Sequence, residues 1–272
     1  MISIMQLTHS FVVPAYGDSP FLEECIESLL DQSLKSPIII TTSTPSDYIQ
    51  HIAQKYKLEY RINPIGNVNI ANDWNFAFAQ VHTPFVTLAH QDERYHPDYT
   101  AMIFRRLNQL NSKNVSIIFT DYWELIENTS QNRPSIHATI KNLMLFPFLL
   151  KSNISSKIVK RALLIFGTPI CCSSVTFHKA FLDDFEFSDR CKVALDWHTW
   201  LSLSKQDGQF LYINKKLIHH RIHLGSETYR QIQSGIRYNE ELDIFTSIWG
   251  RIKAHFIMKF YALGHNFNVK VK

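Results

Sequence analysis

Residues 85–98 read FVTLAHQDERYHPD, and the rest of the chain can be interpreted around this stretch. The apolar run at 85–89 is followed at once by polar and ionisable side chains, among them His90, Asp92 and Glu93. This pattern predicts a buried strand that carries oxygen and nitrogen ligands at its carboxyl end. Ligands of open α/β sheets bind outside the carboxyl ends of the strands. We therefore expect the functional site at this edge of a sheet.

Short apolar runs alternate with amphipathic segments through the first half of the chain. Strands are predicted at 10–13, 37–40, 58–62, 85–88 and 115–119, and helices at 20–30, 46–56, 70–79 and 102–110. Alternation of strands with helices indicates parallel strands, because each helical crossover passes over one face of the sheet. The sequence therefore predicts an α/β fold with a mixed, mostly parallel sheet and helices on both faces.

The second half of the chain is less regular. Residues 124–167 begin polar and become apolar and basic, which predicts a helical insertion beside the sheet, either a surface excursion or a lid. A helix is predicted from 196, a strand at 210–213, a segment at 217–223 that returns to the centre of the sheet, and a helix over 240–263. We expect one domain over 1–228 and a C-terminal helical tail over 229–272.

Composition and charge narrow the class of protein. The chain has 272 residues, of which 45% are hydrophobic and 19% charged, as expected for a globular domain with a sizeable core. Its net charge of +4 permits contact with phosphates or anionic lipid but does not indicate nucleic-acid binding. The four cysteines form no C-x-x-C pair. The N-terminus shows no signal peptide. The apolar run at 143–150 is too short to span a bilayer. We expect a cytoplasmic protein in a reducing compartment.

Several common enzyme motifs are absent from the sequence. There is no G-x-x-x-x-G-K and no G-x-G-x-x-G, and the eight glycines provide no Gly-rich phosphate loop. These absences argue against a P-loop enzyme and against a dinucleotide-dependent dehydrogenase. No G-x-S-x-G nucleophile elbow is present either.

Five segments, in order along the chain, carry a resemblance to one enzyme family. The first is VVPAY at 12–16 with the helical segment at 22–33, and the second is 67–77, where Trp74-Asn75 stands in place of a common Arg-Asn. The third is HQDE at 90–93, the fourth is LDW at 195–197, and the fifth is 220–228, which contains the R-x-H pattern of Arg221 and His223. Together these segments resemble family 2 glycosyltransferases, an inverting, nucleotide-sugar-dependent class with the Rossmann-like GT-A fold. The resemblance covers about residues 10–228.

The resemblance implies a metal site. The HQDE segment stands in place of the family's D-x-D-D motif, which implies Asp92 as a ligand of Mn²⁺ or Mg²⁺ and His223 as a second ligand. Such a cation would neutralise the charge of the departing diphosphate. His90 departs from the family at the first acidic position, where an imidazole either favours Mn²⁺ or hydrogen-bonds a phosphate. The alternative for Asp92 is a strand-end carboxylate that caps the following turn.

The resemblance also implies contacts with the nucleotide sugar. The implied residues are Pro14, Ala15, Tyr16, Asn75, His90, Gln91 and Arg221. The Tyr16 ring would stack near the base, or it packs in a tight turn; Arg221 would pair with the diphosphate, or it forms a surface ion pair. Many relatives carry an Asp after the second strand that reads the base, whereas this chain has TTS at 41–43. The sequence therefore leaves the base open.

Asp196 is implied as the general base, because LDW is similar to the family's Glu-Asp-Trp motif. It would accept the proton of the acceptor hydroxyl as that oxygen attacks the anomeric carbon opposite the departing diphosphate. The alternative is that Asp196 caps the helix that follows it.

We expect from this resemblance a hexosyltransferase-type enzyme that moves a sugar from a nucleotide-diphosphate donor to a glycan or lipid-linked acceptor with inversion. A bacterial surface-polysaccharide pathway is the implied setting. Two alternatives are open. One is a non-catalytic nucleotide-sugar-binding protein, which the His90 departure allows. The other is a sugar-1-phosphate nucleotidyltransferase, which would need a Gly-rich loop that the first strand lacks.

The predicted tail helix has an apolar stripe and a basic one. Phe245, Trp249, Ile252, Phe256 and Phe260 fall on one side, while Arg251, His255 and Lys259 recur at four-residue spacing. Such an apolar stripe either packs on its own domain or lies on an anionic leaflet. The second interpretation would place the protein at the inner face of the cell membrane.

Overall fold

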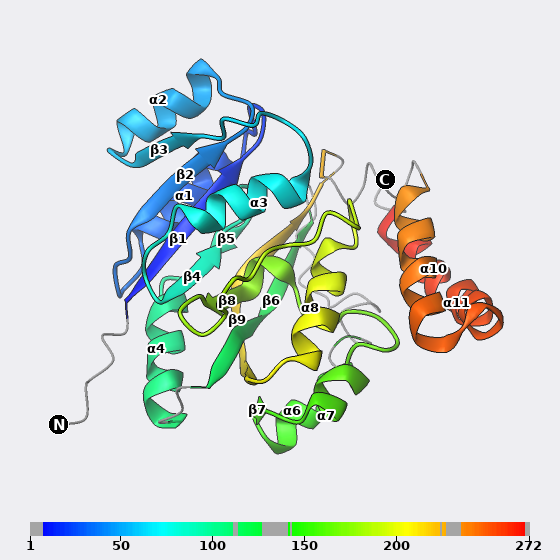
Figure 1. Ribbon diagram of the computed structural model, residues 1–272. Helices are drawn as coiled ribbons and strands as arrows, with labels where there is room; N and C mark the ends of the chain where they lie inside the picture. Colours follow the sequence, from blue (N-terminus) through cyan, green and yellow to red (C-terminus); the bar gives the residue numbers. More distant parts are fainter. Residues whose placement is uncertain are drawn as a thin grey trace.

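A computed structural model shows a large twisted sheet covered by helices (Figure 1). It describes residues 8–110, 114–126, 141, 143–223, 225–226 and 235–269, with side chains as far as Tyr261. The strands are β1 His9–Ala15, β2 Ile38–Thr42, β3 Glu59–Ile62, β4 Phe85–Leu88, β5 Arg94–Tyr95, β6 Val115–Ile126, β7 Asn153–Ile154, β8 Val175–His178 and β9 Gln209–Ile222. The helices are α1 Leu22–Leu30, α2 Asp47–Lys55, α3 Ile70–Ala79, α4 Tyr99–Leu110, α6 Phe146–Leu150, α7 Lys157–Ala162, the short 3₁₀ helix η1 Cys172–Ser174, α8 Leu195–Lys205, α10 Ile236–Trp249 and α11 Arg251–Val269.

The strands are arranged in the order β3-β2-β1-β4-β8-β6-β9-β5, with β7 beside β9. The pairs β3–β2, β2–β1, β1–β4 and β6–β9 are parallel, whereas β8 runs antiparallel to both of its neighbours. Because β1, β2 and β4 are parallel, their carboxyl ends meet at one edge of the sheet. The predicted mixed, mostly parallel α/β sheet is confirmed.

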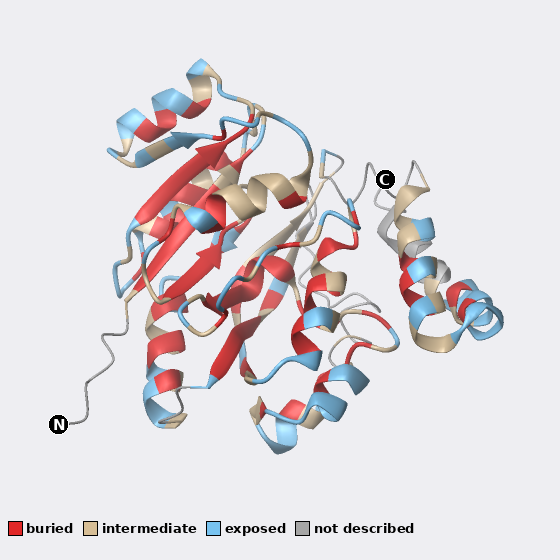
Figure 2. Ribbon diagram, viewed as in Figure 1, coloured by how far each residue is buried: buried red, intermediate tan, exposed pale blue. Residues whose placement is uncertain are grey.

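Helices cover both faces of the sheet, and each face has its own apolar cluster. Along β1, Val12 belongs to one cluster, while its neighbours Phe11 and Val13 belong to the other, as alternation along a strand requires. Helices α1, α2 and α4 complete the cluster around Phe11, and α3, α8, α10 and α11 contribute to the cluster around Val12. Figure 2 shows the central strands buried and the outer sides of the helices exposed.

The predicted elements differ from the observed ones mainly in the second half of the chain. The strand expected at 210–213 and the segment expected at 217–223 are one strand, β9, which pairs in parallel with an equally extended β6. The register between β6 and β9 shifts near Asp121, which interrupts the two-residue alternation along the strands. The hydrophobic pattern therefore did not reveal that both strands continue beyond this point. Strand β8 was missed because its four residues, VTFH at 175–178, are too few for the alternation of apolar and polar residues to stand out, although all four are buried.

The insertion and the tail are also more detailed than expected. The part of 124–167 that the structure describes consists of the end of β6, then α6, β7 and α7. The single helix predicted over 240–263 is two helices, which separate at Gly250, where φ is 76°. This backbone angle suits glycine and ends α10. No helix that the structure describes is long and apolar enough to cross a membrane.

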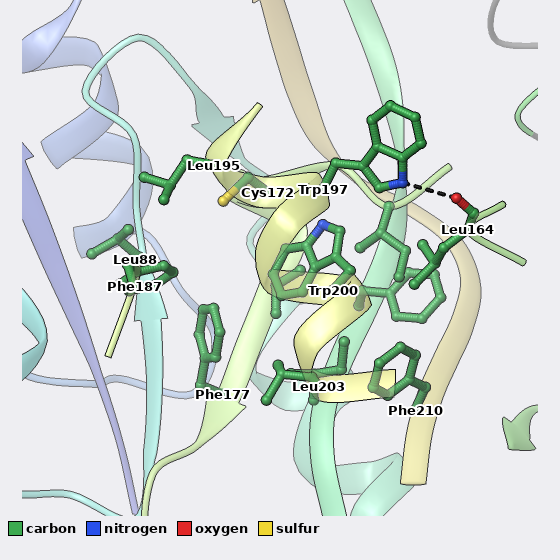
Figure 3. Close-up of a cluster of buried hydrophobic side chains, with 14 of the residues drawn as sticks. Leu88, Leu164, Cys172, Phe177, Phe187, Leu195, Trp197, Trp200, Leu203 and Phe210 are labelled. Atoms are coloured by element: carbon green, nitrogen blue, oxygen red, sulfur yellow. Dashed lines mark hydrogen bonds between the residues drawn. The ribbon is translucent and has the colours of Figure 1, made fainter. Parts of the chain in front are cut away.

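Two tryptophans of α8 anchor this helix against the sheet (Figure 3). Trp197 and Trp200 are 1% and 0% exposed, and Trp200 stacks on Phe177 of β8 with ring centroids 5.8 Å apart. The Trp197 indole N–H donates to the Leu164 carbonyl at 2.9 Å. The Trp200 indole N–H has no hydrogen-bond partner among the described residues. The two side chains are therefore a matched pair that differs in one hydrogen bond.

We expect Trp197→Phe to destabilise the protein more than Trp200→Phe does. Both changes remove a similar ring volume, but only Trp197→Phe leaves a buried carbonyl without its donor, at a cost of about 1–2 kcal/mol beyond the packing loss. Urea unfolding of the two variants measures the difference. Equal destabilisation would show that the bond to Leu164 contributes nothing.

Candidate active site at the carboxyl edge of the sheet

The loops after β1 and β4 lie side by side at the carboxyl edge. The Ala89 N–H extends the parallel pairing of the two strands by donating to Val12 at 2.8 Å. Beyond it, the Gln91 amide holds Tyr16 from both sides: its Oε1 accepts from the Tyr16 N–H at 3.0 Å, and its Nε2 donates to the Tyr16 carbonyl at 2.9 Å. Gln91 therefore fixes the loop that follows β1, in addition to any contact with a ligand.

A narrow pocket lies beside this loop, with about 150 Å³ of space between its atoms but no room for a water molecule. Its lining consists of Pro14, Ala15, Thr41, Thr42, Asn63, Asp73 and Phe76. The Asp73 carboxylate accepts from Asn63 Nδ2 at 3.0 Å and from Ser43 Oγ at 2.7 Å. No Asp directly follows β2 in this chain. The carboxylate in the pocket comes instead from Asp73 of α3. Sequence reasoning missed Asn63 and Asp73, although Asp73 directly precedes the Trp74-Asn75 pair.

The predicted neighbours Tyr16 and Asn75 have well-defined partners. Tyr16 is 47% exposed, so it is not a packing residue of the core, and its hydroxyl accepts from Asn67 Nδ2 at 3.0 Å. The Asn75 amide donates to the Phe187 carbonyl at 2.9 Å and accepts from the Phe187 N–H at 2.7 Å. Asn75 therefore anchors the chain that leads to α8, a role that sequence reasoning did not foresee.

The turn after β4 gathers possible metal ligands. His90, Asp92 and Glu93 each offer one ligand atom, and these atoms all lie within 4.8 Å of one another. The Nε2 atom of His90 is buried and has no hydrogen-bond partner among the described residues. The His90 ring lies beside Trp74, with ring centroids 5.2 Å apart. An unpaired imidazole nitrogen next to a carboxylate is the donor set that a divalent transition metal binds.

Asp92 is held in its ionised form. Its Oδ2 lies 3.2 Å from His223 Nε2, so the structure brings together the two predicted ligands. Burial opposes ionisation, but the hydrogen bond from His223 and the nearby His90 and His220 keep the pKa of Asp92 below its ordinary value. The Asp92 carboxylate is thus ready to bind a cation near neutral pH.

Glu93 is a positioning residue, because both of its oxygens are already engaged. It is 2% exposed, its Oε1 accepts from His220 Nδ1 at 2.6 Å and from Ser173 Oγ at 3.1 Å, and its Oε2 accepts from the Arg221 N–H at 3.2 Å. Although burial of the imidazole disfavours its charge, the Glu93 carboxylate raises the pKa of His220 to about 10. Glu93 therefore ties β9 and η1 to the turn that carries Asp92.

The Arg221 side chain is fixed between two elements. Its guanidinium pairs with Glu24 of α1, donates to the Asp92 carbonyl at 3.1 Å and lies over the Phe21 ring at 4.3 Å. The Arg221 side chain is 10% exposed and that of Glu24 is 42% exposed, so the ion pair considered from sequence is present, with its arginine buried and its carboxylate open to solvent. Sequence reasoning missed Glu24, whose place in the first turn of α1 gave no sign of this partner.

Asp196 lies in the first turn of α8. The N-cap residue of this helix is Ala194, and the amides of Lys192, Val193 and Ala194 donate to the Glu240 carboxylate of α10 at 2.6, 2.9 and 2.9 Å. The predicted alternative, in which Asp196 is the N-cap, is therefore wrong, because Ala194 holds that position and Asp196 is the second residue of the helix. Glu240 binds the amides of the residues that lead into α8. Asp196 accepts instead from the Trp197 N–H at 2.7 Å.

The electrostatic surroundings of Asp196 connect it to the rest of the site. Burial raises the pKa of Asp196, and the nearby charges of Arg237 and Lys141 counteract part of this rise. Burial also raises the pKa of the Cys172 thiol well above its ordinary value, and both Asp196 and Glu93 contribute to that rise. The Cys172 thiol of η1 is therefore near both the Asp196 and the Glu93 carboxylates.

We expect Glu93→Ala to lower the free energy of unfolding by about 1–3 kcal/mol, because it removes the acceptor of a hydroxyl, of a backbone N–H and of His220, whose side chain is 39% exposed. Asp207→Ala is the control, since it removes a carboxylate that is 91% exposed and paired only with the exposed Lys157. Chemical denaturation measures both variants. Equal stability of the two variants would contradict the positioning role.

Comparison with known proteins identifies the family of the chain. The sequence profile described as Glycosyl transferase family 2 matches residues 10–173, which run from β1 to η1 and include the turn at 90–93. The chain belongs to glycosyl transferase family 2. The matched part holds the pocket residues and the His90–Asp92–Glu93 cluster of this family 2 glycosyltransferase.

Relatives agree with this assignment. The family 2 glycosyltransferase is 23% identical over 249 residues to an uncharacterized glycosyltransferase of Rickettsia typhi, a match that covers 88% of this chain and 70% of the relative. An uncharacterized glycosyltransferase of Rickettsia prowazekii is 25% identical over 228 residues, and the match covers 80% of this chain and 65% of the relative.

Solved structures share the fold. TarS of S. aureus superposes with a TM-score of 0.62 at 14% identity, and the match covers 97% of this chain and 75% of TarS. A mannosyltransferase of Pyrobaculum calidifontis, solved with GDP-Man and Mn²⁺, gives 0.62 at 11% identity with the same coverage. Glucosyl-3-phosphoglycerate synthase of Mycobacterium tuberculosis, solved with Mn²⁺ and UDP-glucose, gives 0.55 at 14% identity over 90% of this chain and 80% of that chain. These matches confirm the predicted GT-A type of fold.

Proposed function

We propose that this family 2 glycosyltransferase moves a sugar, a hexose by family analogy, from a nucleotide-diphosphate donor to a hydroxyl of a glycan or lipid-linked acceptor, with inversion and with the help of a divalent cation. The observation that carries the proposal is the cluster of His90, Asp92 and Glu93 in the turn after β4, at the carboxyl edge of the sheet, with His223 in hydrogen-bond contact with Asp92. Three proteins of similar fold were solved with UDP-GlcNAc, with GDP-Man and with UDP-glucose.

The donor base would lie at the mouth of the pocket that Pro14, Ala15 and Asp73 line, and the pocket has to widen to admit it. The Asp73 carboxylate accepts hydrogen bonds, so it suits a base with a ring N–H, such as uracil or guanine, over cytosine, whose corresponding ring nitrogen is an acceptor. Tyr16, held by Asn67 and Gln91, stands beside this pocket and offers an aromatic face. Asp73 would thus take the role that an Asp after β2 has in many relatives.

The diphosphate would lie near the cation site. Asp92, His223 and the unpaired Nε2 of His90 are the atoms that would hold the cation, and two imidazoles with one carboxylate favour Mn²⁺ over Mg²⁺. The bound cation would supply positive charge against the charge of the leaving diphosphate. Glu93 keeps the β9 backbone and Arg221 in register with this turn.

Asp196 would act as the general base. Asp196 is partly exposed, and its carboxylate, like that of Glu93, is near Cys172. The raised pKa of Asp196 makes it a better proton acceptor than an ordinary carboxylate. Attack by the activated hydroxyl opposite the diphosphate inverts the anomeric carbon in one displacement. A non-catalytic binding protein would have no use for this group.

We further propose that 1–228 forms the catalytic domain and 229–272 a helical tail, and that the enzyme works on the cytoplasmic side of a bacterial membrane in surface-polysaccharide synthesis. The support for a connected tail is structural. Glu240 of α10 accepts hydrogen bonds from the amides of Val193 and Ala194, which lead into α8, and the charge of Arg237 counteracts part of the rise that burial causes in the pKa of Asp196.

We expect Asp92→Ala to abolish Mn²⁺-dependent release of nucleotide from the donor sugar, by about 100-fold or more, because the cation loses its carboxylate ligand. Mn²⁺ binding followed by electron paramagnetic resonance should weaken in parallel. Asp98→Ala is the control, since its carboxylate is exposed in the same turn. If wild type and Asp92→Ala released nucleotide equally slowly, both at background, the enzyme proposal would fail and the binding protein would remain.

We expect kcat to rise with pH through the pKa of Asp196, because a base must be ionised to accept a proton. Since burial raises this pKa, the acid limb of the profile lies above the range of an ordinary carboxyl group. Asp196→Asn should lower kcat by about 10²–10⁴-fold and leave nucleotide affinity unchanged, whereas the exposed Asp189→Asn should change neither. An unaltered kcat in Asp196→Asn would assign the base elsewhere.

A further inference from the structure

The apolar stripe of α11 faces away from the protein. Ile252, Phe256 and Phe260 are 89%, 64% and 63% exposed, and their four-residue spacing places them on one side of the helix. The opposite side packs on the domain through Ala254 and Met258, which are fully buried. The commoner interpretation of such a stripe, packing on its own domain, is therefore wrong for these three side chains.

A second exposed apolar surface lies on α6 and α7. Leu143, Phe146, Leu149, Leu150 and Ile158 are between 54% and 81% exposed. Between the two helices runs a groove of about 370 Å³, whose lining residues are all apolar. Single exposed apolar side chains are ordinary, but a contiguous group of this size marks an interaction surface.

The two surfaces are joined at the end of α7. Phe166, which lines the groove, stacks on Trp249 of α10 with ring centroids 5.1 Å apart. The Trp249 indole donates to the Ile165 carbonyl at 2.8 Å, and the Tyr261 ring of α11 packs against Gly167. Figure 1 shows α7, α10 and α11 on the side of α8, far from α2. We call α6, α7 and α11, with the groove, the apolar-basic face.

The charge of this face is of one sign. No Asp or Glu occurs between 128 and 182 or between 244 and 272, although the chain has 24 acidic residues. Exposed cations flank the apolar side chains instead: Lys151, Lys157 and Arg161 near the groove, and Arg251, Lys253 and Lys259 on α11. Asp207 pairs with Lys157, and the other five cations have no ion pair among the described residues.

We propose that the apolar-basic face docks on an anionic lipid bilayer, with a lipid chain entering the groove. An outward apolar stripe with lysine and arginine on its flanks fits the boundary between acyl chains and phosphate headgroups. The absence of acidic residues from both segments favours a negatively charged partner. The sequence suggested the tail alone as the contact, whereas the structure adds α6, α7 and the groove.

Docking would also orient the proposed active site, and this consequence rests on the proposed function. The inner side of α11 carries Tyr261, which stacks near Trp197 in the first turn of α8, beside Asp196. The outer side of the same helix would lie on the bilayer. The general base would then stand within one helix diameter, roughly 10 Å, of the lipid surface, which suits a lipid-linked acceptor.

The test is flotation of the purified chain with phosphatidylcholine vesicles, with and without phosphatidylglycerol. We expect binding to the anionic vesicles only, weakened by high salt. The double variants Phe256→Ser with Phe260→Ser, Leu149→Ser with Leu150→Ser, and Lys253→Glu with Lys259→Glu should each reduce binding about tenfold or more. Leu34→Ser with Ile62→Ser is the matched control, because these side chains are 42% and 51% exposed on other elements.

Folding and oligomeric state are followed in the same samples by circular dichroism and size-exclusion chromatography. The proposal is overturned if wild type does not float with anionic vesicles, or if the variants float as well as wild type. A third outcome also overturns it: wild type is a dimer without affinity for vesicles, and the variants are monomers. The apolar-basic face would then be an interface between two copies of this chain. Release of nucleotide without vesicles should be unchanged in all variants, so failure of docking is distinct from failure of sugar transfer.

Discussion

The buried carboxylate of Glu93 holds together the parts of the site that come from distant segments. It receives hydrogen bonds from η1 through Ser173 and from β9 through His220 and Arg221, while its own backbone follows the turn of Asp92. A charge at this depth is stable only when such donors surround it. The donors of β9, His220 and Arg221, reach Glu93 because β9 extends along β6 as far as the turn that follows β4. The position of Asp92 relative to His223 therefore depends on the length of one strand and on one carboxylate.

The sequence predicted the structure correctly where the hydrophobic periodicity and the type of the polar residues point to the same feature. The alternation of strands and helices predicted the sheet, and the apolar run that ends at His90 predicted which edge carries the site. His223 was placed beside Asp92 by family resemblance, and the two side chains are in hydrogen-bond contact. Local patterns of this kind survive in any fold that keeps the order of its strands.

Contacts between distant segments could not be foreseen from local patterns. Such contacts occur at the site: Arg221 pairs with Glu24, the Asn75 side chain hydrogen-bonds the Phe187 backbone, and Asp73 lines the pocket. In each case the sequence around the residue does not indicate its partner. The outward stripe of α11 was also ambiguous, because a helix with apolar residues on one side has the same sequence whether that side faces a core or a lipid surface. Only the position of the other helices decides between the two.

The hydrogen bonds that Glu240 accepts from the residues just before α8 have a consequence for how the chain can be divided. A fragment that stops before α10 would leave the amides of residues 192–194 without their acceptor, at the start of the helix that carries Asp196. The tail is an appendage in the order of the sequence, but it is an integral part of the fold around the proposed base. Excision of α10 and α11 would thus remove a structural support of the chemistry along with the outer surface.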